Sequence, residues 1–229
     1  MTKRSPINAG LRIIQSGELV EQIWMQVDEM AGALNAMTET ALKNNEFANL
    51  RSAGVAKVQY EMSASGWSST SYGISFPVMR KTRRKSVPAA WLNYQISVLG
   101  GGIPQDQDGT KSIGPVVHVS FWHDRADFSD PGLYVEFPPA WDDCGIEDGR
   151  LLVWKGEETD EFPQWTFSIR LLHLNNEEAL RKSIIDPVKA LLAGAQAATA
   201  LPTGLPGLVF YASEDQSVPG WNLIARASE

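Results

Sequence analysis

Charged side chains are the first candidates for chemistry in this chain, and they are concentrated in one basic run and one acidic stretch. The basic run lies between two expected strands, so it predicts an exposed turn that can reach the phosphates of a nucleic acid. Tyr72 and Trp91 lie nearby in the sequence and can stack on bases. The candidate contacts are Arg80, Lys81, Arg83, Arg84 and Lys85. This run predicts a nucleic-acid-binding turn as one alternative function.

The acidic stretch, residues 124–161, holds 12 carboxylates, and it lies in the half of the chain, residues 91–229, whose net charge is −11. Such a field repels nucleic acid and favours a basic partner. Trp141 lies inside the stretch, and an exposed tryptophan is a typical anchor of a protein interface. The predicted partner-binding residues are Trp141, Asp142, Asp143, Glu147, Asp148, Glu157 and Glu158.

Motifs of catalysis and cofactor binding are missing from the sequence. The segment Gly109-Thr110-Lys111-Ser112 lacks the Gly-Lys-Ser/Thr order of a phosphate-binding loop, and no serine lies in a Gly-x-Ser-x-Gly motif. Carboxylates flank Cys144, and their negative field raises the pKa of a thiol and suppresses the reactive thiolate. We expect no cofactor, and the sequence favours a non-enzymatic protein, although an active site assembled in space without a motif stays an open alternative.

The three histidines do not form a set of metal ligands in the sequence. His118 and His123 are five residues apart on one expected strand, so they project to opposite faces, and His173 closes another strand. No His or Cys pair has the spacing of a zinc site, and the aspartates near His123 lack the pattern of a calcium loop. We therefore expect solvated residues at strand ends and no bound metal.

Length and composition indicate one globular domain over residues 1–229. The chain is 43% hydrophobic and 21% charged, and its one cysteine cannot form an internal disulfide. Pro6, Asn8 and Gly10 interrupt what would have to be the apolar part of a signal peptide. The longest small-apolar tract is too short to span a membrane. We expect a soluble, cytoplasmic protein without membrane contact.

The periodicity of apolar residues predicts two helices. A stripe with spacings of three and four predicts an amphipathic helix over 17–44, with Ser16 as its N-cap and residues 1–15 as a flexible segment. Asn175 and Glu178 resemble a capping box that opens a second helix over 176–193. The stripe of the first helix is Leu19, Ile23, Val27, Met30, Leu34 and Met37.

Alternating apolar and polar residues from Gly54 onward predict strands with one buried and one wet face. The expected strands lie at 56–62, 72–78, 92–98, 117–121, 133–137, 151–154 and 165–171. A Pro- and Gly-rich connector, 200–207, leads to a final strand pair that we expect at the edge of the sheet. The buried face is expected to carry Val58, Tyr60, Ile74, Phe76, Tyr94, Ile96, Val119 and Phe121.

These elements predict an α+β fold, with a largely antiparallel, twisted sheet of seven to nine strands covered by an N-terminal long helix and a second helix near the C-terminus. The expected function is a non-enzymatic intracellular protein–protein interaction module, such as an adaptor, an inhibitor or an immunity-like factor. It would present acidic loops and exposed aromatics to a basic protein partner. A small-molecule-binding protein with an apolar pocket between sheet and helices, and the nucleic-acid-binding protein above, are the alternatives.

Overall fold

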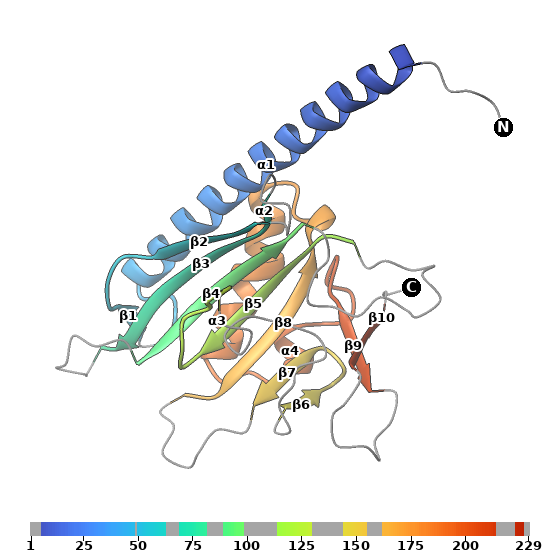
Figure 1. The fold of residues 1–229 in the computed structure, drawn as a ribbon. Coiled ribbons are helices and arrows are strands. Elements are labelled where there is room, and N and C mark those ends of the chain that lie inside the picture. Colours follow the sequence, from blue (N-terminus) through green and yellow to red (C-terminus); the bar gives the residue numbers. More distant parts are fainter. Residues whose placement is uncertain are drawn as a thin grey trace.

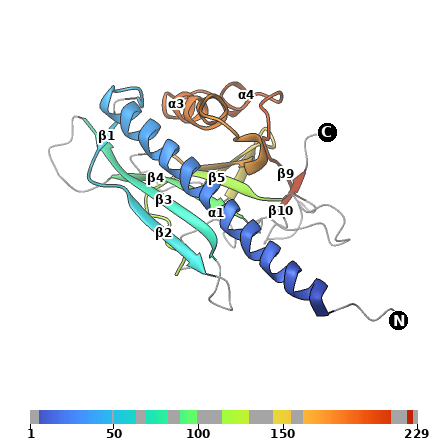
Figure 2. The ribbon, with the colours of Figure 1, turned by 90° about the horizontal axis from the view of Figure 1, so that it is seen from above.

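The computed structural model describes residues 6–48, 50–62, 69–81, 89–98, 114–129, 144–154, 162–213 and 223–226. A large antiparallel sheet carries helices on one of its faces (Figures 1 and 2). The helices are α1 (Pro6–Lys43), α2 (Glu177–Leu180), α3 (Asp186–Leu192) and α4 (Ala197–Ala200), with a 3-10 turn, η1 (Leu171–His173), and a π-helical turn, η2 (Arg181–Ile185).

Eight strands form the large sheet, and all of their pairings are antiparallel. They are β1 (Leu50–Ser52), β2 (Lys57–Met62), β3 (Ser69–Arg80), β4 (Ala90–Ser97), β5 (Val116–Trp122), β6 (Cys144–Glu147), β7 (Leu151–Trp154) and β8 (Gln164–Arg170). The strand order is β1-β3-β4-β5-β8-β7-β6, and β2 pairs with the earlier part of β3 beside β1. The predicted fold class is confirmed. The expected strand at 133–137 lies outside the described residues, and β1 and β6 were not predicted.

The last two strands, β9 (Phe210–Ser213) and β10 (Leu223–Arg226), form a separate two-stranded sheet, so the prediction that they extend the edge of the large sheet is wrong. The residues before β9 are attached to β8 instead. The N–H of Arg170 donates to the carbonyl of Gly207 at 2.7 Å, and the N–H of Val209 donates to the carbonyl of Ser168 at 2.9 Å. Because β7 pairs with only the first residues of β8, the rest of that β8 edge is available to this segment.

Helix α1 begins at Pro6, ten residues before the predicted N-cap, so residues 6–15 belong to the helix. Proline suits a first helical position because its missing N–H has no partner there in any case. Ser16 lies inside the helix, and its hydroxyl donates to the carbonyl of Arg12 at 2.8 Å. The helix ends close to the predicted place, where Asn45 takes a positive φ of 62°. At 38 residues, α1 is about 57 Å long.

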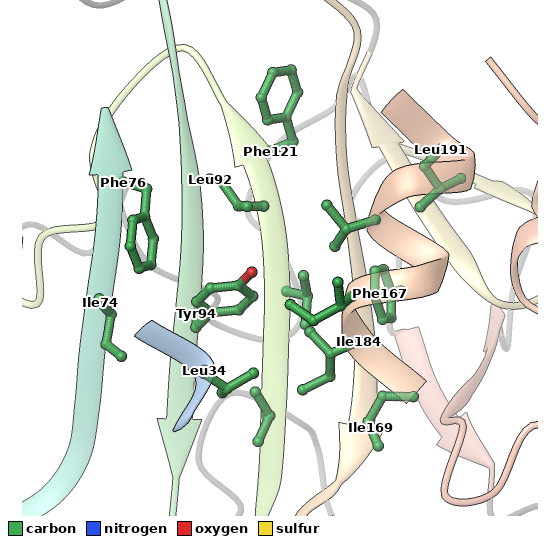
Figure 3. Packing of buried hydrophobic residues seen from close by; sticks show 14 of the residues in the cluster. Leu34, Ile74, Phe76, Leu92, Tyr94, Phe121, Phe167, Ile169, Ile184 and Leu191 are labelled. Carbon is green, nitrogen blue, oxygen red and sulfur yellow. The ribbon is translucent and has the colours of Figure 1, made fainter. Parts of the chain in front are cut away.

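The second half of α1 packs on the sheet together with η2 and α3 (Figure 3). Leu34 of α1 and Ile184 of η2 are fully buried over Tyr94 at the centre of the sheet. The Tyr94 hydroxyl lies 2.8 Å from Thr38 Oγ1. This hydrogen bond gives a partner to the one polar atom of the buried Tyr94 side chain. The core prediction is confirmed for the apolar positions of β3, β4 and β5, which are Ile74, Phe76, Tyr94, Ile96, Val119 and Phe121.

The core prediction is wrong for β2, where Val58 is 50% exposed and Tyr60 is 54% exposed. Val58 pairs with Ile74 and Tyr60 pairs with Tyr72, so both side chains do point to the helix-bearing face. They stay exposed because β2 lies at the border of the sheet, where it pairs with β3 alone among the described strands. The Tyr60 ring packs edge-on against Tyr72 of the neighbouring strand β3, with a centroid distance of 4.8 Å.

The second predicted helix is present as the continuous run of α2, η2 and α3, and it starts one residue later than expected. Asn176 is its N-cap, and the Asn176 side chain accepts a hydrogen bond from the N–H of Ala179 at 2.9 Å. The wide π-helical turn comes directly before α3, which holds Pro187 in its first turn. A proline ring clashes with the carbonyl four residues earlier in a regular helix, and the wider turn relieves that clash.

Candidate functional site

The face of the large sheet opposite the helices is lined by polar side chains that are buried, so the prediction of a wet face is wrong for the central strands. Each of these side chains belongs to a residue that is at most 4% exposed. They are Ser71 and Ser75 of β3, Asn93, Gln95 and Ser97 of β4, His118 and Ser120 of β5, and Thr166 and Ser168 of β8. We call them the polar face. Buried polar groups are stable only when they are hydrogen-bonded.

One hydrogen-bonded chain on the polar face joins β5 to β8. The indole N–H of Trp122 donates to Thr166 Oγ1 at 3.1 Å, and that hydroxyl donates to Ser120 Oγ at 2.9 Å. Ser120 and Thr166 are direct partners in the sheet, so the contact follows from the strand register. The side chains of a cross-strand pair contribute to the stability of a sheet in this way.

A second chain passes through Ser168, the sheet partner of His118. Tyr211 of β9 donates its hydroxyl proton to Ser168 Oγ at 2.6 Å, and the same oxygen lies 2.6 Å from His118 Nδ1. Since Ser168 accepts from Tyr211, its single proton is available to His118 Nδ1. Burial raises the pKa of Tyr211, so the phenol stays a donor. His118 is therefore not the solvated residue that we expected, because it is fully buried.

Serine, histidine and tyrosine are residue types of nucleophilic and acid–base sites, but access decides whether they react. Ser168 and His118 are both completely buried in the described structure. The chain from Tyr211 through Ser168 to His118 links β9 to the large sheet. Among the described residues no group of three or more His, Cys, Asp or Glu side chains is placed to hold a metal.

A segment that follows β5 is tied to the polar face by two amide side chains. Gln59 Nε2 donates to the carbonyl of Ala126 at 2.8 Å, and Gln59 Oε1 accepts from the N–H of Phe128 at 3.2 Å. Asn93 Oδ1 accepts from the N–H of Ala126 at 3.2 Å. The Phe128 ring lies against Gly73, where an added Cβ would be 3.0 Å from Phe128 Cζ.

His173 is exposed as expected, whereas His123 and Cys144 are each half-buried. The ring of His123 is half-buried, with Nε2 3.1 Å from the carbonyl oxygen of Phe162, and His173 is exposed in η1. Cys144 is half-buried, and desolvation by burial raises the pKa of its thiol to about 12. The pKa shift of Cys144 has the direction that the sequence predicts, but its main cause is burial and not the field of the neighbouring carboxylates.

Two of the predicted partner-binding residues, Glu147 and Asp148, are exposed at the turn between β6 and β7. The turn is closed by the N–H of Arg150 donating to the carbonyl of Glu147 at 3.0 Å, and Asp148 and Gly149 both have positive φ, as in type I′ hairpins. The other predicted members of this site lie outside the described residues; they are Trp141, Asp142, Asp143, Glu157 and Glu158.

The C-terminal segment holds this hairpin in place. The N–H of Tyr211 donates to the carbonyl of Gly149 at 2.6 Å, and Arg150 Nη1 donates to the carbonyl of Leu201 at 2.7 Å. The guanidinium of Arg150 also lies 5.7 Å from the centre of the Phe210 ring. The carboxylates of the hairpin are therefore displayed on a turn whose backbone is anchored.

The predicted basic turn is described only at its first two residues. Arg80 and Lys81 are exposed, and the guanidinium of Arg80 lies over the Phe162 ring at 4.8 Å from its centre. Arg83, Arg84 and Lys85 lie outside the described residues. One of the expected phosphate contacts is thus engaged with an aromatic ring of the same chain.

Exposed apolar side chains are concentrated on the first half of α1, a surface that the sequence reasoning missed. Figures 1 and 2 show this half extending beyond the end of the sheet. We call residues 10–26 the projecting half of α1. Its exposed large side chains are Leu11, Ile13, Ile14, Leu19, Val20 and Met25, and Ile13 is 73% exposed. A signal was available, because Ile13 and Val20 continue the seven-residue spacing of Val27 and Leu34.

The chain matches no protein-family model, no curated protein and no solved structure. Over the residues that the structure describes, no helix combines the length and apolar character needed to cross a membrane.

Proposed function

We propose that this protein is a non-enzymatic protein–protein interaction module that binds its partner through the projecting half of α1. The observation that supports this proposal is the group of six exposed large apolar side chains on one helix whose other half belongs to the core. Fully burying a Leu, Ile or Val side chain contributes roughly 1.5–3 kcal/mol. Apolar surface gathered on a single element is typical of an interaction site.

The stability of the helix gives a second physical reason for a partner. Residues 10–22 of the helix are all exposed, and a helix segment of this length is only marginally stable in water without tertiary packing. Gly10 and Gly17 make the projecting half weaker still, since each costs about 1 kcal/mol relative to alanine in a helix interior. Burial of the apolar side chains by a partner would offset this cost.

The acidic hairpin supports a second contact, with a basic protein surface. Glu147 and Asp148 are exposed on a turn that is anchored through Gly149 and Arg150. Carboxylates displayed in this way accelerate encounter with a basic partner by long-range attraction. A binding site for a small molecule between sheet and helices, and a nucleic-acid-binding turn at residues 80–85, stay alternative predictions.

The experiment that tests the proposal is quantitative affinity capture from cell extract with the tagged full chain as bait. The variant Ile13→Asp with Val20→Asp replaces two of the exposed apolar side chains by charges, and we expect it to lose the proteins that the wild type retains. The control, Gln15→Asp with Gln22→Asp, adds the same charge at exposed polar positions of the same helix. Equal capture by the wild type and both variants would contradict the proposal.

A further inference from the structure

We propose that the edge strand β2 pairs with β2 of a second copy of this chain, antiparallel about a two-fold axis at Gln59, and so joins the two large sheets. This surface is separate from the projecting half of α1, so the inference goes beyond the proposed function. Its observations are the outward-facing backbone of β2, the order of charges along the strand, and the half-exposed apolar side chains on its helix-bearing face.

The backbone groups of Val58 and Tyr60 point away from the sheet. In β3 the carbonyl of Pro77 accepts a hydrogen bond from the N–H of Ala53, on the side where β1 and β2 lie. Backbone groups alternate in direction along a strand, so the other odd-numbered residues of β3 face β2 as well. Their partners in β2, which face β3 in turn, are Lys57, Gln59 and Glu61. No backbone hydrogen bond outside the β3 ladder joins residues 57–61 to another described segment.

A second β2 can bond to both outward-facing residues at once. With the two-fold axis at Gln59, Val58 lies opposite Tyr60 of the second copy, and Tyr60 lies opposite Val58 of the second copy. Residues at such positions of an antiparallel ladder exchange both of their N–H···O bonds, so the two strands gain about four backbone hydrogen bonds. The same patch is used on both copies, which gives a closed dimer.

The charges of β2 are self-complementary in this register. Lys57 lies opposite Glu61 of the second copy, at a position without ladder hydrogen bonds, where facing side chains are closest. Opposite charges placed directly across two strands are stabilising, and like charges are destabilising. Neither side chain takes part in an ion pair with another described residue. Charged side chains usually keep sheet edges apart, but here their order makes the edge attract its own copy.

On the helix-bearing face, the pairing covers apolar side chains that a single chain leaves uncovered. Val58 is 50% exposed and Tyr60 is 54% exposed. The Tyr60 ring packs edge-on against Tyr72, and this contact holds the ring on the helix-bearing face. In the dimer, Val58 of each copy lies against Tyr60 of the other. A β-branched residue opposite an aromatic one is a stabilising cross-strand pair.

The helical layer leaves room for this contact. Tyr72 and Ile74 of β3 are buried while their partners in β2 are half exposed, so the cover ends over β3. Figures 1 and 2 show α1 running along β3. The β3 strands of the two copies would be three strand spacings apart, about 14 Å. Packed helices need only about 8–10 Å between their axes, so the two copies of α1 do not collide.

The opposite face of β2 also leaves the edge accessible. Ala126 is bonded to the side chain of Gln59 in β2 and to that of Asn93 in β4. The Phe128 ring lies against Gly73 of β3. This segment therefore lies under β3, on the inner side of the edge strand.

The size of the contact predicts a weak dimer. Residues 57–61 span about 17 Å, which is small compared with an interface that buries roughly 800 Å² on each partner. We therefore expect a dissociation constant on the order of tens of micromolar.

The primary test is sedimentation equilibrium of the full chain between about 1 and 500 µM, which brackets the expected constant. The wild type should change from monomer to dimer. Lys57→Glu alone and Glu61→Lys alone each place like charges opposite one another, and each should weaken the dimer at least tenfold. Lys57→Glu with Glu61→Lys restores opposite charges and should dimerise like the wild type. Glu29→Lys reverses an exposed charge on α1 and is the control.

Mixing the two single variants tests the register directly. In a mixed pair every charge at positions 57 and 61 faces its opposite, so an equimolar mixture of Lys57→Glu and Glu61→Lys should dimerise although neither variant does so alone. Denaturant midpoints of each variant report whether the fold is retained. A wild type that is monomeric at 500 µM, or a dimer that neither single variant weakens, would overturn the proposal.

Amide hydrogen exchange, followed by NMR at low and high concentration, identifies the strand. The N–H groups of Val58 and Tyr60 should exchange several-fold more slowly at high concentration, because they are bonded only in the dimer. The N–H of Gln59 faces β3 in both states and is the internal reference. A dimer in which the exchange of Val58 and Tyr60 is unchanged would use another surface, and this would also overturn the proposal.

Failure of this inference is distinct from failure of the proposed function. Ile13→Asp with Val20→Asp should leave the β2 dimer unchanged, and the charge reversals in β2 should leave the capture of α1-dependent proteins unchanged. If the chain is monomeric but Lys57→Glu loses a captured protein, β2 pairs with an extended segment of that protein, and the second copy is wrong.

Discussion

The hydroxyl of Tyr211 donates a 2.6 Å hydrogen bond to Ser168 Oγ, and this contact ties the small C-terminal sheet to the centre of the large one. The two residues are 43 positions apart, and both are buried. Ser168 also contacts His118, so a single hydroxyl connects β5, β8 and β9. A buried network of this kind is stable only while each member is satisfied.

Replacing Tyr211 by phenylalanine removes the donor and keeps the ring. We expect Tyr211→Phe to lower the free energy of unfolding by about 1–2 kcal/mol, because a buried hydrogen bond is lost without a large change in volume. Ser168→Ala should cost a similar amount, and the double variant should cost less than the sum of the two. Denaturant midpoints of the three variants measure the coupling, and strict additivity would show that the contact contributes nothing.

Ile96 and Val58 lie on the same face of the sheet, but only Ile96 is buried by other parts of the chain. Ile96 is fully buried, so Ile96→Ala should lower the free energy of unfolding by roughly 2–5 kcal/mol through lost burial and a new cavity. Val58 is half exposed, and Val58→Ala should cost about 0.5 kcal/mol. Chemical denaturation of the two variants compares these costs. Similar midpoints for both variants would contradict the assigned burial.

Two features of the structure require glycine at position 207, namely a positive φ and the close approach of His173. Its φ is 76°, and an added Cβ would be 2.7 Å from His173 Cβ. Gly194 is a matched control, since its φ is 86° but an added Cβ would have no atom within 4 Å. We expect Gly194→Ala to cost about 1–2 kcal/mol from backbone strain alone. Gly207→Ala should cost about 1–3 kcal/mol more, because the clash is added. Thermal or denaturant midpoints that are equal for both variants would exclude a role for the close approach.

An ion pair between Glu46 and Lys189 should make stability depend on pH. Glu46 Oε2 lies 3.0 Å from Lys189 Nζ, and this contact lowers the pKa of Glu46 below its ordinary value of 4.5. The pair therefore stabilises the fold above about pH 4.5, where the unfolded glutamate is also ionised, and the contribution is lost as pH falls through the folded-state pKa.

The size of this effect is limited because both side chains are about one-third exposed. We expect at most about 1 kcal/mol. Unfolding of the wild type and of Glu46→Gln is compared between pH 3 and pH 7. The difference between the two should shrink towards low pH, and a difference that stays constant over this range would rule out the pair as its source.

The acidic hairpin should affect the rate of encounter with a basic partner. Glu147→Gln with Asp148→Asn removes two exposed charges, and asparagine tolerates the positive φ of 50° at position 148. We expect slower association with a basic partner, most clearly at low salt, and nearly unchanged dissociation. Glu177→Gln with Asp186→Asn removes two exposed charges from the helical layer and is the control. Surface plasmon resonance at two salt concentrations separates the rates, and equal association rates for both variants would contradict the role of the hairpin.

Local patterns in the sequence determined the elements of this protein. The alternation of residues such as Ile74, Phe76, Tyr94 and Ile96 predicted strands and the face that they bury, because successive side chains of a strand point to opposite sides. The spacing of Val27, Met30 and Leu34 predicted a helix for the same kind of reason. Its start could not be found, because Gly10, Ser16 and Gly17 have low helix propensity and resemble an end of the helix.

The tertiary structure alone decided which faces are covered. Val58 and Ile74 are neighbours on one face, yet only Ile74 is buried, because cover depends on elements distant in the sequence. The same reason explains the buried polar face. A partial signal was present in the residues that lie on the side of the polar face. In β3, β4, β5 and β8 these residues include no charged side chain except Arg170, whereas in the edge strand β2 they include Lys57 and Glu61. Buried hydroxyl and amide groups can form hydrogen bonds with one another, whereas buried charges are costly unless they are paired. The absence of charges at these positions is therefore consistent with their burial, but the elements that bury them are known only from the fold.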